Sequence, residues 1–209
     1  DSIELLKKNN GGKGKLIAGT SLAEPANVLI IGAGIVGINA MQMSLGLGAS
    51  TTLLDVNNEL LNNIKSQYPA VNVAESSETV IKNLLPMIDI VVGAVLTPGG
   101  KPPTVITKDM LSLMEPKSIL SDVSVDQGGC FETSKPTTHG EPTYEVDSII
   151  HYCVKNIPSA VPYTATNALN EATKPFILKF ANSGLHGLFN DDKLLMALRP
   201  YQYYATEKI

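Results

Sequence analysis

Residues 28–37 read Val-Leu-Ile-Ile-Gly-Ala-Gly-Ile-Val-Gly, so four apolar residues run directly into a G-x-G-x-x-G pattern. The apolar run predicts a strand that is buried on both faces of a parallel sheet. The residues from Ile35 to Leu45 contain no proline and predict a helix. A strand, a glycine turn and a helix in this order are the context in which the glycine pattern binds a dinucleotide.

The three glycines of the pattern have different expected tasks. Gly32 allows the tight turn out of the strand, Gly34 lets the backbone approach a pyrophosphate, and Gly37 lets the helix pack closely on the strand. The first N–H groups of the helix face the phosphates, and the helix dipole favours their negative charge. We therefore expect a pyrophosphate at this turn.

A second apolar run, at residues 51–54, ends at Asp55. A carboxylate at the end of the second strand accepts hydrogen bonds from an adenosine ribose and repels a 2′-phosphate. NAD is therefore favoured over NADP as the cofactor. An alternative is that Asp55 only caps a helix expected over residues 57–66, and the two roles are compatible.

Strands and helices alternate along most of the chain. This alternation predicts an α/β fold with a Rossmann-type, doubly wound parallel sheet. The expected strands cover residues 28–31, 51–54, 71–74, 88–94, 118–123 and 148–154. The expected helices cover residues 35–45, 59–66, 78–85 and 108–114, the last capped by Thr107.

The two ends of the chain are expected to be helical. We predict a linker helix and hinge at residues 1–12, an NAD-binding domain at 13–160 and a C-terminal helical segment at 161–209. In that last segment, one helix should begin at Thr164 or Thr166 and run to about Asn182, interrupted by Pro175, and another should cover residues 190–198. The loop at residues 98–103 follows a strand at its carboxyl end and is either a ligand loop or a plain connector.

The composition excludes several classes of protein. The 209 residues are 44% hydrophobic and 17% charged, as in an ordinary globular protein. A net charge of −4 without basic clusters argues against a nucleic-acid surface, and no apolar run is long enough to span a membrane. Two cysteines are too few for a disulfide framework, which favours a reducing, cytoplasmic compartment. No metal site is expected, because the spacing of Cys130, His139, His151 and Cys153 fits no standard zinc pattern.

Residues 121–130 read Ser-Asp-Val-Ser-Val-Asp-Gln-Gly-Gly-Cys and form the second informative segment. Asp122 lies at the end of a predicted strand, and Asp126 lies beyond it. We expect Asp122 to accept hydrogen bonds from backbone N–H groups and Asp126 to reach into the ligand cleft. The alternative is that both residues only form turns.

Five longer motifs are more specific than the glycine pattern. They are Asp-Val-Ser-Val-Asp-Gln-Gly-Gly-Cys at 122–130, Thr-Ser-Lys-Pro-Thr-Thr-His at 133–139, His-Tyr-Cys-Val-Lys-Asn-Ile-Pro at 151–158, Gly-Ala-Val-Leu at 93–96 with Pro98-Gly99, and Ala-Thr-Asn-Ala-Leu at 165–169. These motifs resemble those of alanine dehydrogenases. The resemblance extends from about residue 12 to about residue 182. The related transhydrogenase subunit shares the fold but lacks the blocks at 126–129 and 151–156 in this form.

The resemblance implies a reversible oxidative deamination of L-alanine to pyruvate and ammonium, with hydride transfer to NAD. It implies that Asp126 is the active-site aspartate, which assists proton transfer or stabilises a cationic imine. It also implies the following cofactor contacts: Gly32, Ala33, Gly34, Ile35 and Val36 at the pyrophosphate, Asp55 at the adenosine ribose, Ser76 near the adenine, Val95, Leu96 and Val123 beside the nicotinamide half, and Asn156 at the nicotinamide ribose or amide.

The resemblance also implies what this chain does not contribute. In alanine dehydrogenases a lysine, a histidine and an arginine that bind the substrate lie in a preceding domain, which no part of this chain matches. Neither His139 nor His151 is expected to replace that histidine. The chain alone should therefore bind NAD but turn over poorly, and its C-terminal segment should return to the substrate domain. The family further implies a homo-oligomer, a hexamer. A non-catalytic NAD-binding module, a transhydrogenase-like fragment and a dehydrogenase for another small amino or keto acid remain open.

Overall fold

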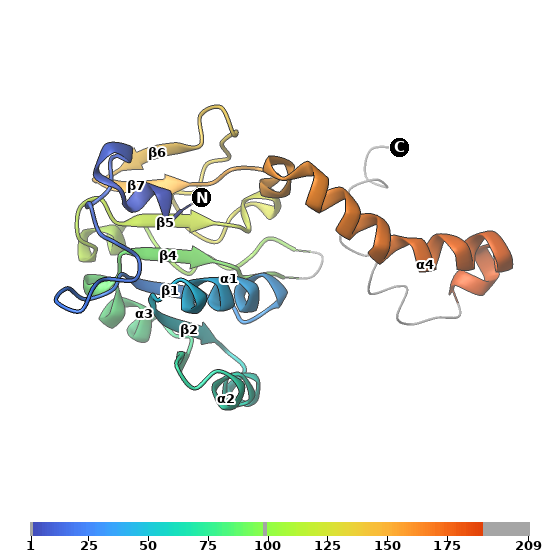
Figure 1. Ribbon diagram of the computed structural model, residues 1–209, viewed down its shortest axis with the longest axis horizontal. Coiled ribbons are helices and arrows are strands. Elements are labelled where there is room, and N and C mark those ends of the chain that lie inside the picture. The colour runs from blue at the N-terminus through green and yellow to red at the C-terminus, as the bar shows by residue number, and fades with distance from the viewer. Residues whose placement is uncertain (1, 98–99, 190–209) are drawn as a thin grey trace. The chain divides into compact units, whose positions relative to one another are not determined.

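The computed structural model describes residues 2–97 and 100–189, with side chains up to residue 182 (Figure 1). Its contacts divide the chain into two units, Asp1–Lys155 and Asn156–Ile209. The helix expected at residues 190–198 and the Pro98-Gly99 part of the glycine-rich loop lie outside the described residues.

The first unit contains a seven-stranded sheet with the strand order β3-β2-β1-β4-β5-β7-β6 (Figure 1). Every neighbouring pair is parallel except β6 with β7. The strands are β1 Asn27–Ile31, β2 Ser50–Asp55, β3 Asn72–Glu75, β4 Ile90–Gly93, β5 Ile119–Asp122, β6 Thr143–Val146 and β7 Ile149–Tyr152. The predicted doubly wound sheet is confirmed, and its six predicted strands end within two residues of those observed.

The sequence did not predict β6, the antiparallel strand at the edge of the sheet. It forms a hairpin with β7, and the turn between them contains no glycine. Instead, Asp147 and Ser148 adopt left-handed backbone angles, with φ of 49° and 65°. Hairpin turns need such angles, and they are usually supplied by Asn-Gly or Asp-Gly pairs. This hairpin therefore lacks the usual sequence signal.

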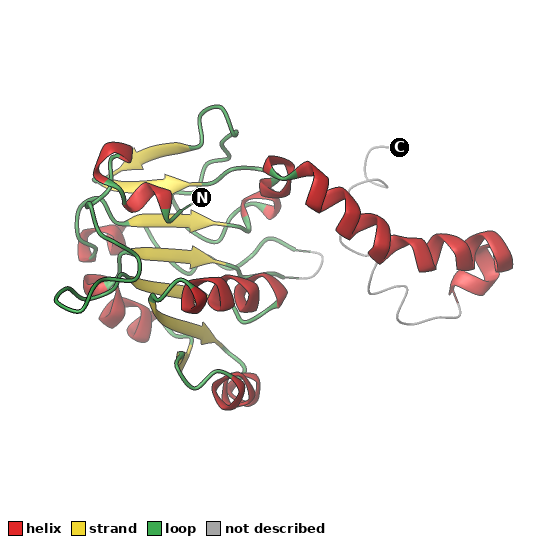
Figure 2. Ribbon diagram, viewed as in Figure 1, coloured by secondary structure: helices red, strands yellow, loops and turns green. Residues whose placement is uncertain are grey.

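The longer helices of the first unit match the prediction, whereas the shorter ones do not (Figure 2). The segment predicted as an α-helix at 108–114 is a 3₁₀ helix, and its N-cap is Lys108 instead of Thr107. The opening segment forms two 3₁₀ turns instead of one helix, and Leu6 is buried there. The α-helices are α1 Ile35–Gly46, α2 Asn58–Gln67 and α3 Glu78–Leu84, and the 3₁₀ helices are η1 Glu4–Leu6, η2 Lys8–Asn10, η3 Leu85–Met87, η4 Asp109–Leu113 and η5 Val125–Gln127.

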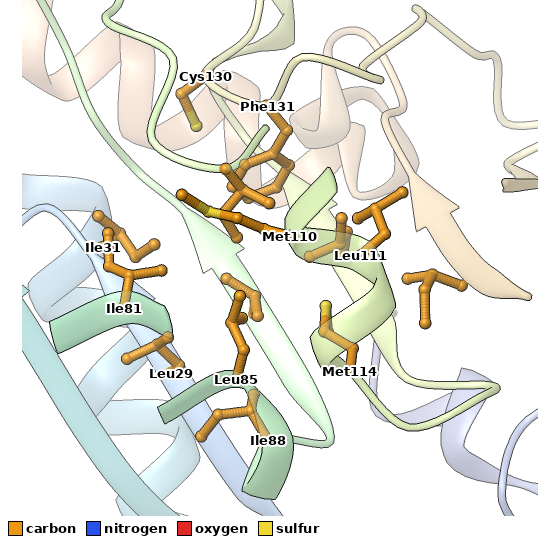
Figure 3. Close-up of a cluster of buried hydrophobic side chains, with 14 of the residues drawn as sticks. Leu29, Ile31, Ile81, Leu85, Ile88, Met110, Leu111, Met114, Cys130 and Phe131 are labelled. Carbon is orange, nitrogen blue, oxygen red and sulfur yellow. The ribbon is translucent and has the colours of Figure 1, made fainter. Parts of the chain in front are cut away.

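Two apolar cores lie on the two faces of the sheet, because strand side chains alternate in direction. Along β1, Val28 and Ile30 pack into a cluster with residues of α1 and α2. Leu29 and Ile31 pack on the other side, with residues of α3 and η4 (Figure 3). The alternation explains why every residue from 28 to 31 is apolar, since both faces of this central strand are covered.

The second unit contains the 3₁₀ helix η6, Ile157–Ala160, and the helix α4, Pro162–Phe189. The predicted start at Thr164 or Thr166 is wrong, because the helix already begins at Pro162. Proline suits the first turn of a helix, where no N–H donor is needed. The predicted interruption at Pro175 is also wrong, because the helix continues through that residue. Of the helices that the structure describes, none combines the length and the apolar character needed to cross a membrane.

Candidate functional site

The candidate site lies at the carboxyl ends of β1 and β4, where the strand order reverses. Ligands of open α/β sheets bind in the crevice at such a point. The turn after β1 and the loop after β4 approach each other closely there. Gly32 has a φ of 104°, and a Cβ on it would lie 2.5 Å from the carbonyl oxygen of Ala94. Glycine is therefore required at this turn by its backbone angle and by the nearby strand end.

The other two glycines also have distinct surroundings. A Cβ on Gly37 would collide with the carbonyl oxygen of Gly32, so this glycine brings α1 against the turn. A Cβ on Gly34 would meet no atom within 4 Å. Gly34 is the N-cap of α1, and no side chain caps the helix there. The start of α1 thus has no capping side chain and has open space beside Gly34, which fits the pyrophosphate of a dinucleotide.

Asp55 connects the end of β2 to the glycine turn. Its Oδ2 accepts a hydrogen bond from the backbone N–H of Ala33 at 2.6 Å, and its Oδ1 accepts one from Asn57 at 2.9 Å. The capping alternative for Asp55 is not what the structure shows, because Asn57 is the N-cap of α2 and accepts from the N–H of Leu60. Half-buried Ser76 follows β3 and donates its N–H to the Asp55 carbonyl at 2.8 Å. Asp55, Ala33 and Ser76 are thus brought together.

The loops after β4 and β5 are also joined. The N–H of Val123 donates to the carbonyl of Gly93 at 3.0 Å, and the hydroxyl of Ser124 donates to the carbonyl of Val95 at 2.7 Å. Val95 and Val123 are half-buried, whereas Leu96 is 60% exposed. Among the other large apolar side chains at this end of the sheet, Ile35 is 85% exposed and Val36 is 48% exposed. The site is therefore bordered by apolar side chains that water reaches.

Asp122 is fully buried and organises the loop that follows β5. Its carboxylate accepts hydrogen bonds from the N–H groups of Ser124 and Cys130, both at 2.9 Å, and from the hydroxyl of Ser134 at 2.5 Å. The expectation that Asp122 binds backbone N–H groups is confirmed. Asp126 lies on η5, within the loop that Asp122 closes, and its side chain is exposed.

Sequence reasoning missed a buried cluster that supports this loop. The Tyr144 hydroxyl donates to the carbonyl of Thr133 at 2.8 Å, and its ring stacks on His151 with centroids 4.9 Å apart. The two ring nitrogens of His151 face the Thr133 hydroxyl at 2.7 Å and the Ile149 carbonyl at 3.0 Å. Burial lowers the pKa of His151 below its ordinary value of 6.5. The sequence offered one possible signal for this cluster, namely Tyr144 within a short strand of alternating side-chain direction.

The two cysteines are buried and belong to the same region. Burial raises the pKa of the Cys130 thiol, and the nearby carboxylate of Asp122 raises it further. Burial likewise raises the pKa of Cys153, whose sulfur lies 3.5 Å from the Tyr144 hydroxyl. Within residues 2–97 and 100–189, no three His, Cys, Asp or Glu side chains are grouped so that they could hold a metal ion. The thiols therefore serve as packed, neutral groups.

Asn156 is the first residue of the second unit. Its backbone is left-handed, with a φ of 52°, and it is the N-cap of η6. Asparagine tolerates this conformation better than most residues do. The carbonyl of Asn156 accepts a hydrogen bond from the N–H of Ser159 at 2.9 Å, which closes the first turn of η6.

The turn at the reversal of strand order, the open helix start and the carboxylate after β2 define the class of a pyridine-nucleotide-binding Rossmann domain. The family model described as "Alanine dehydrogenase/PNT, C-terminal domain" matches residues 2–207. The chain belongs to this family, which confirms the resemblance found in its motifs.

Two relatives and two solved structures illustrate the similarity. The chain is 47% identical to an alanine dehydrogenase of Halomonas elongata over 90% of its own length and 51% of the relative's. It is 42% identical to alanine dehydrogenase 2 of Staphylococcus aureus, over 98% of its own length and 56% of the length of that relative. A solved L-alanine dehydrogenase superimposes with a TM-score of 0.87 at 41% identity, covering 92% of this chain and 54% of that structure. A transhydrogenase from Sinorhizobium meliloti, 20% identical over 79% of this chain and 52% of its own, shares the fold with a TM-score of 0.65. The chain spans about half the length of the curated relatives it matches.

Proposed function

We propose that this chain is the NAD-binding part of an alanine dehydrogenase, which interconverts L-alanine with pyruvate and ammonium. The observation that carries the proposal is the open glycine turn at the strand-order reversal, in a chain 47% identical to an alanine dehydrogenase. NAD, when bound, supplies the hydride acceptor. We also propose that the whole protein is cytoplasmic, as its two cysteines favour, and that it is a homo-oligomer, a hexamer, as the resemblance implies.

The adenosine and pyrophosphate end of the site is assigned to residues around the glycine turn. The backbone from Gly32 to Val36 binds the pyrophosphate, with the free N–H groups of Ile35 and Val36 as donors. Asp55 uses two of its acceptor positions on backbone N–H groups. A carboxylate has about four such positions, so others remain for the ribose hydroxyls. Ser76 lies beside the adenine.

The nicotinamide end is assigned to the loops after β4 and β5. Val95, Leu96 and Val123 provide apolar contacts that exclude water from the reacting face. Asn156 binds the nicotinamide ribose or amide. Asp126, an exposed carboxylate on a loop held by a buried network, accepts or returns the proton at the substrate amino group, or stabilises positive charge there. The resemblance implies a lysine, a histidine and an arginine that bind the substrate, and we propose that these residues come from outside this chain.

The test uses the intact gene product that contains this chain. We expect NADH formation that depends on L-alanine, and weaker or no formation with glycine or L-serine. Asp126→Asn should lower kcat by about 10²- to 10⁴-fold, the usual contribution of a general acid or base. A fully active Asp126→Asn enzyme would remove this residue from the chemistry.

Other outcomes of the same assay identify the alternatives. NAD binding without turnover of any amino acid in the intact product points to a non-catalytic NAD-binding module. If the intact product prefers another small amino or keto acid, the cofactor assignment still holds, but the proposed substrate is wrong. Neither outcome is compatible with the proposed alanine dehydrogenase activity.

A further inference from the structure

A second carboxylate lies beside Asp55 at the adenosine end of the proposed site. Asp55 is the last residue of β2, Glu75 is the last residue of β3, and the two are paired in the register of these parallel strands. Two residues earlier, Leu53 of β2 and Val73 of β3 pack into the same core cluster, on the α1 and α2 side of the sheet. Because side chains alternate along a strand, Asp55 and Glu75 project toward that same side.

The start of α2 holds both carboxylates. The N–H of Asn57 donates to Oδ1 of Asp55, and Nδ2 of Asn58 donates to Oε2 of Glu75, both at 2.9 Å. The N–H of Ser76 donates to the Asp55 carbonyl at 2.8 Å, which fixes the two strand ends against each other. Glu75 is therefore held on the α2 side of the strand end, next to Asp55.

No cation pairs with these two carboxylates in the part of the chain that the structure describes. The ion pairs found there involve neither Asp55 nor Glu75. Lys65 is the only lysine or arginine from residue 55 to residue 77. Its ammonium donates to two carbonyls in the turn that precedes β3, so it lies at the opposite end of that strand. Among the described residues, no positive side chain pairs with the two negative ones at the adenosine end.

We propose that Glu75 is a second residue that sets cofactor preference, acting with Asp55 against a dinucleotide that carries a 2′-phosphate on its adenosine ribose. The inference rests on the proposed NAD site and adds a residue to it. The 2′ substituent of a ribose held by Asp55 would lie near the end of β3, because Asp55 and Glu75 are paired in the strand register. A phosphate there would be repelled by both carboxylates, and this repulsion between exposed charges is strongest when little salt is present. A 2′-hydroxyl carries no charge and is not repelled.

The experiment titrates the purified 209-residue chain with NADH and with NADPH, following nicotinamide fluorescence at low ionic strength. The measured quantity is the ratio of the NADPH Kd to the NADH Kd. Glu75→Gln should lower this ratio by about three- to tenfold, and Glu75→Lys should lower it further. The NADH Kd itself should change by less than about twofold, the size expected when no charge-assisted hydrogen bond is lost.

Glu145 provides the matched control. It is an exposed carboxylate on β6, at the edge of the sheet opposite β3, where it pairs with Lys117. Glu145→Gln and Glu145→Lys change the net charge of the chain by the same amounts as the corresponding Glu75 variants and should leave the ratio unchanged. In about 1 M salt the screening length is about 3 Å, so the effect of Glu75→Gln should largely disappear.

Two results would overturn the role of Glu75 alone. One is an NADH-binding chain in which the Glu75 and Glu145 variants have the same ratio as the wild type. The other is a shift in Glu75→Gln that salt does not reduce, because this indicates a change of shape instead of charge. A wild-type chain that binds neither NADH nor NADPH overturns the proposed cofactor site as well.

Discussion

Oδ2 of Asp55 accepts a hydrogen bond from the backbone N–H of Ala33 at 2.6 Å, across 22 positions of sequence. The carboxylate that the sequence assigns to a ribose therefore also holds the glycine turn in place. Replacing Asp55 removes both effects, so its consequences for binding and for the turn must be separated.

Asp55→Ala should weaken NADH binding by about 10- to 100-fold, because a charge-assisted hydrogen bond is lost. Binding of NADPH should weaken less, so the preference for NADH over NADPH should fall. Fluorescence titration with both nucleotides measures this, and thermal unfolding reports the cost to the turn. An unchanged preference between the two nucleotides would refute the ribose assignment.

Gly34→Val tests the open space at the start of α1. Gly34 has a φ of −70° and an extended ψ of −175°, which any residue adopts, and its Cβ would meet no atom. We expect a normal Tm with at least about tenfold weaker NADH binding, because the valine occupies the space proposed for the pyrophosphate. Gly46→Ala is the control: a Cβ there also meets no atom, but it lies at the far end of α1. Equal NADH affinity in both variants would contradict the assignment.

Asp122→Asn tests the buried network below the proposed active-site loop. The carboxylate now accepts hydrogen bonds from the N–H groups of Ser124 and Cys130. The NH₂ group of asparagine is itself a donor, so it would face these donors without forming a hydrogen bond. We expect a loss of about 2–3 kcal/mol in the free energy of unfolding, measured with urea. Asp126→Asn makes the same chemical change at an exposed position of the same loop and should cost less than Asp122→Asn, because water can solvate an exposed amide. Similar stabilities for the two variants would show that the network contributes little.

His151 should make stability depend on pH. Its pKa is lowered by burial from the ordinary 6.5, so the folded protein keeps the ring neutral while the unfolded chain takes up a proton. The stability is thus fully present above pH 6.5 and is lost as the pH falls through the lower pKa of the folded state. Between pH 7.5 and 5.5, about one unit either side of the ordinary value, His151→Gln should lose less Tm than the wild type, by a few degrees. An unchanged slope in His151→Gln would count against the assignment.

Local patterns predicted the strand, turn and helix around Gly32, because each of these elements is specified by residues close in sequence. They also predicted the hydrogen bonds of Asp122 to the backbone, since a carboxylate at a strand end followed by two glycines has backbone N–H groups nearby. The contact of Asp55 with Ala33 is different, because it exists only once β1 and β2 are paired.

The errors likewise arose where distant contacts decide the local structure. The segment at 108–114 has helix-forming residues, but Ile106 just before it is bridged to Phe131. Buried Met110 and Leu111 then pack into the core as a short 3₁₀ helix. Tyr144 received no role from the sequence, since its partners come from the Thr133 region and from β7, which meet only in the folded sheet.

The strand order reverses between β1 and β4, and this reversal divides the candidate residues into two groups. The two groups are separate in space and also occupy separate parts of the sequence. Everything assigned to the adenosine half, from Gly32 to Ser76, comes from the first three strands and their turns. The residues proposed for the reacting half begin only at Val95. Recombination with a related gene, at a point in the connection that contains α3, would therefore replace the residues that set nucleotide preference. The residues proposed for the chemistry would stay the same.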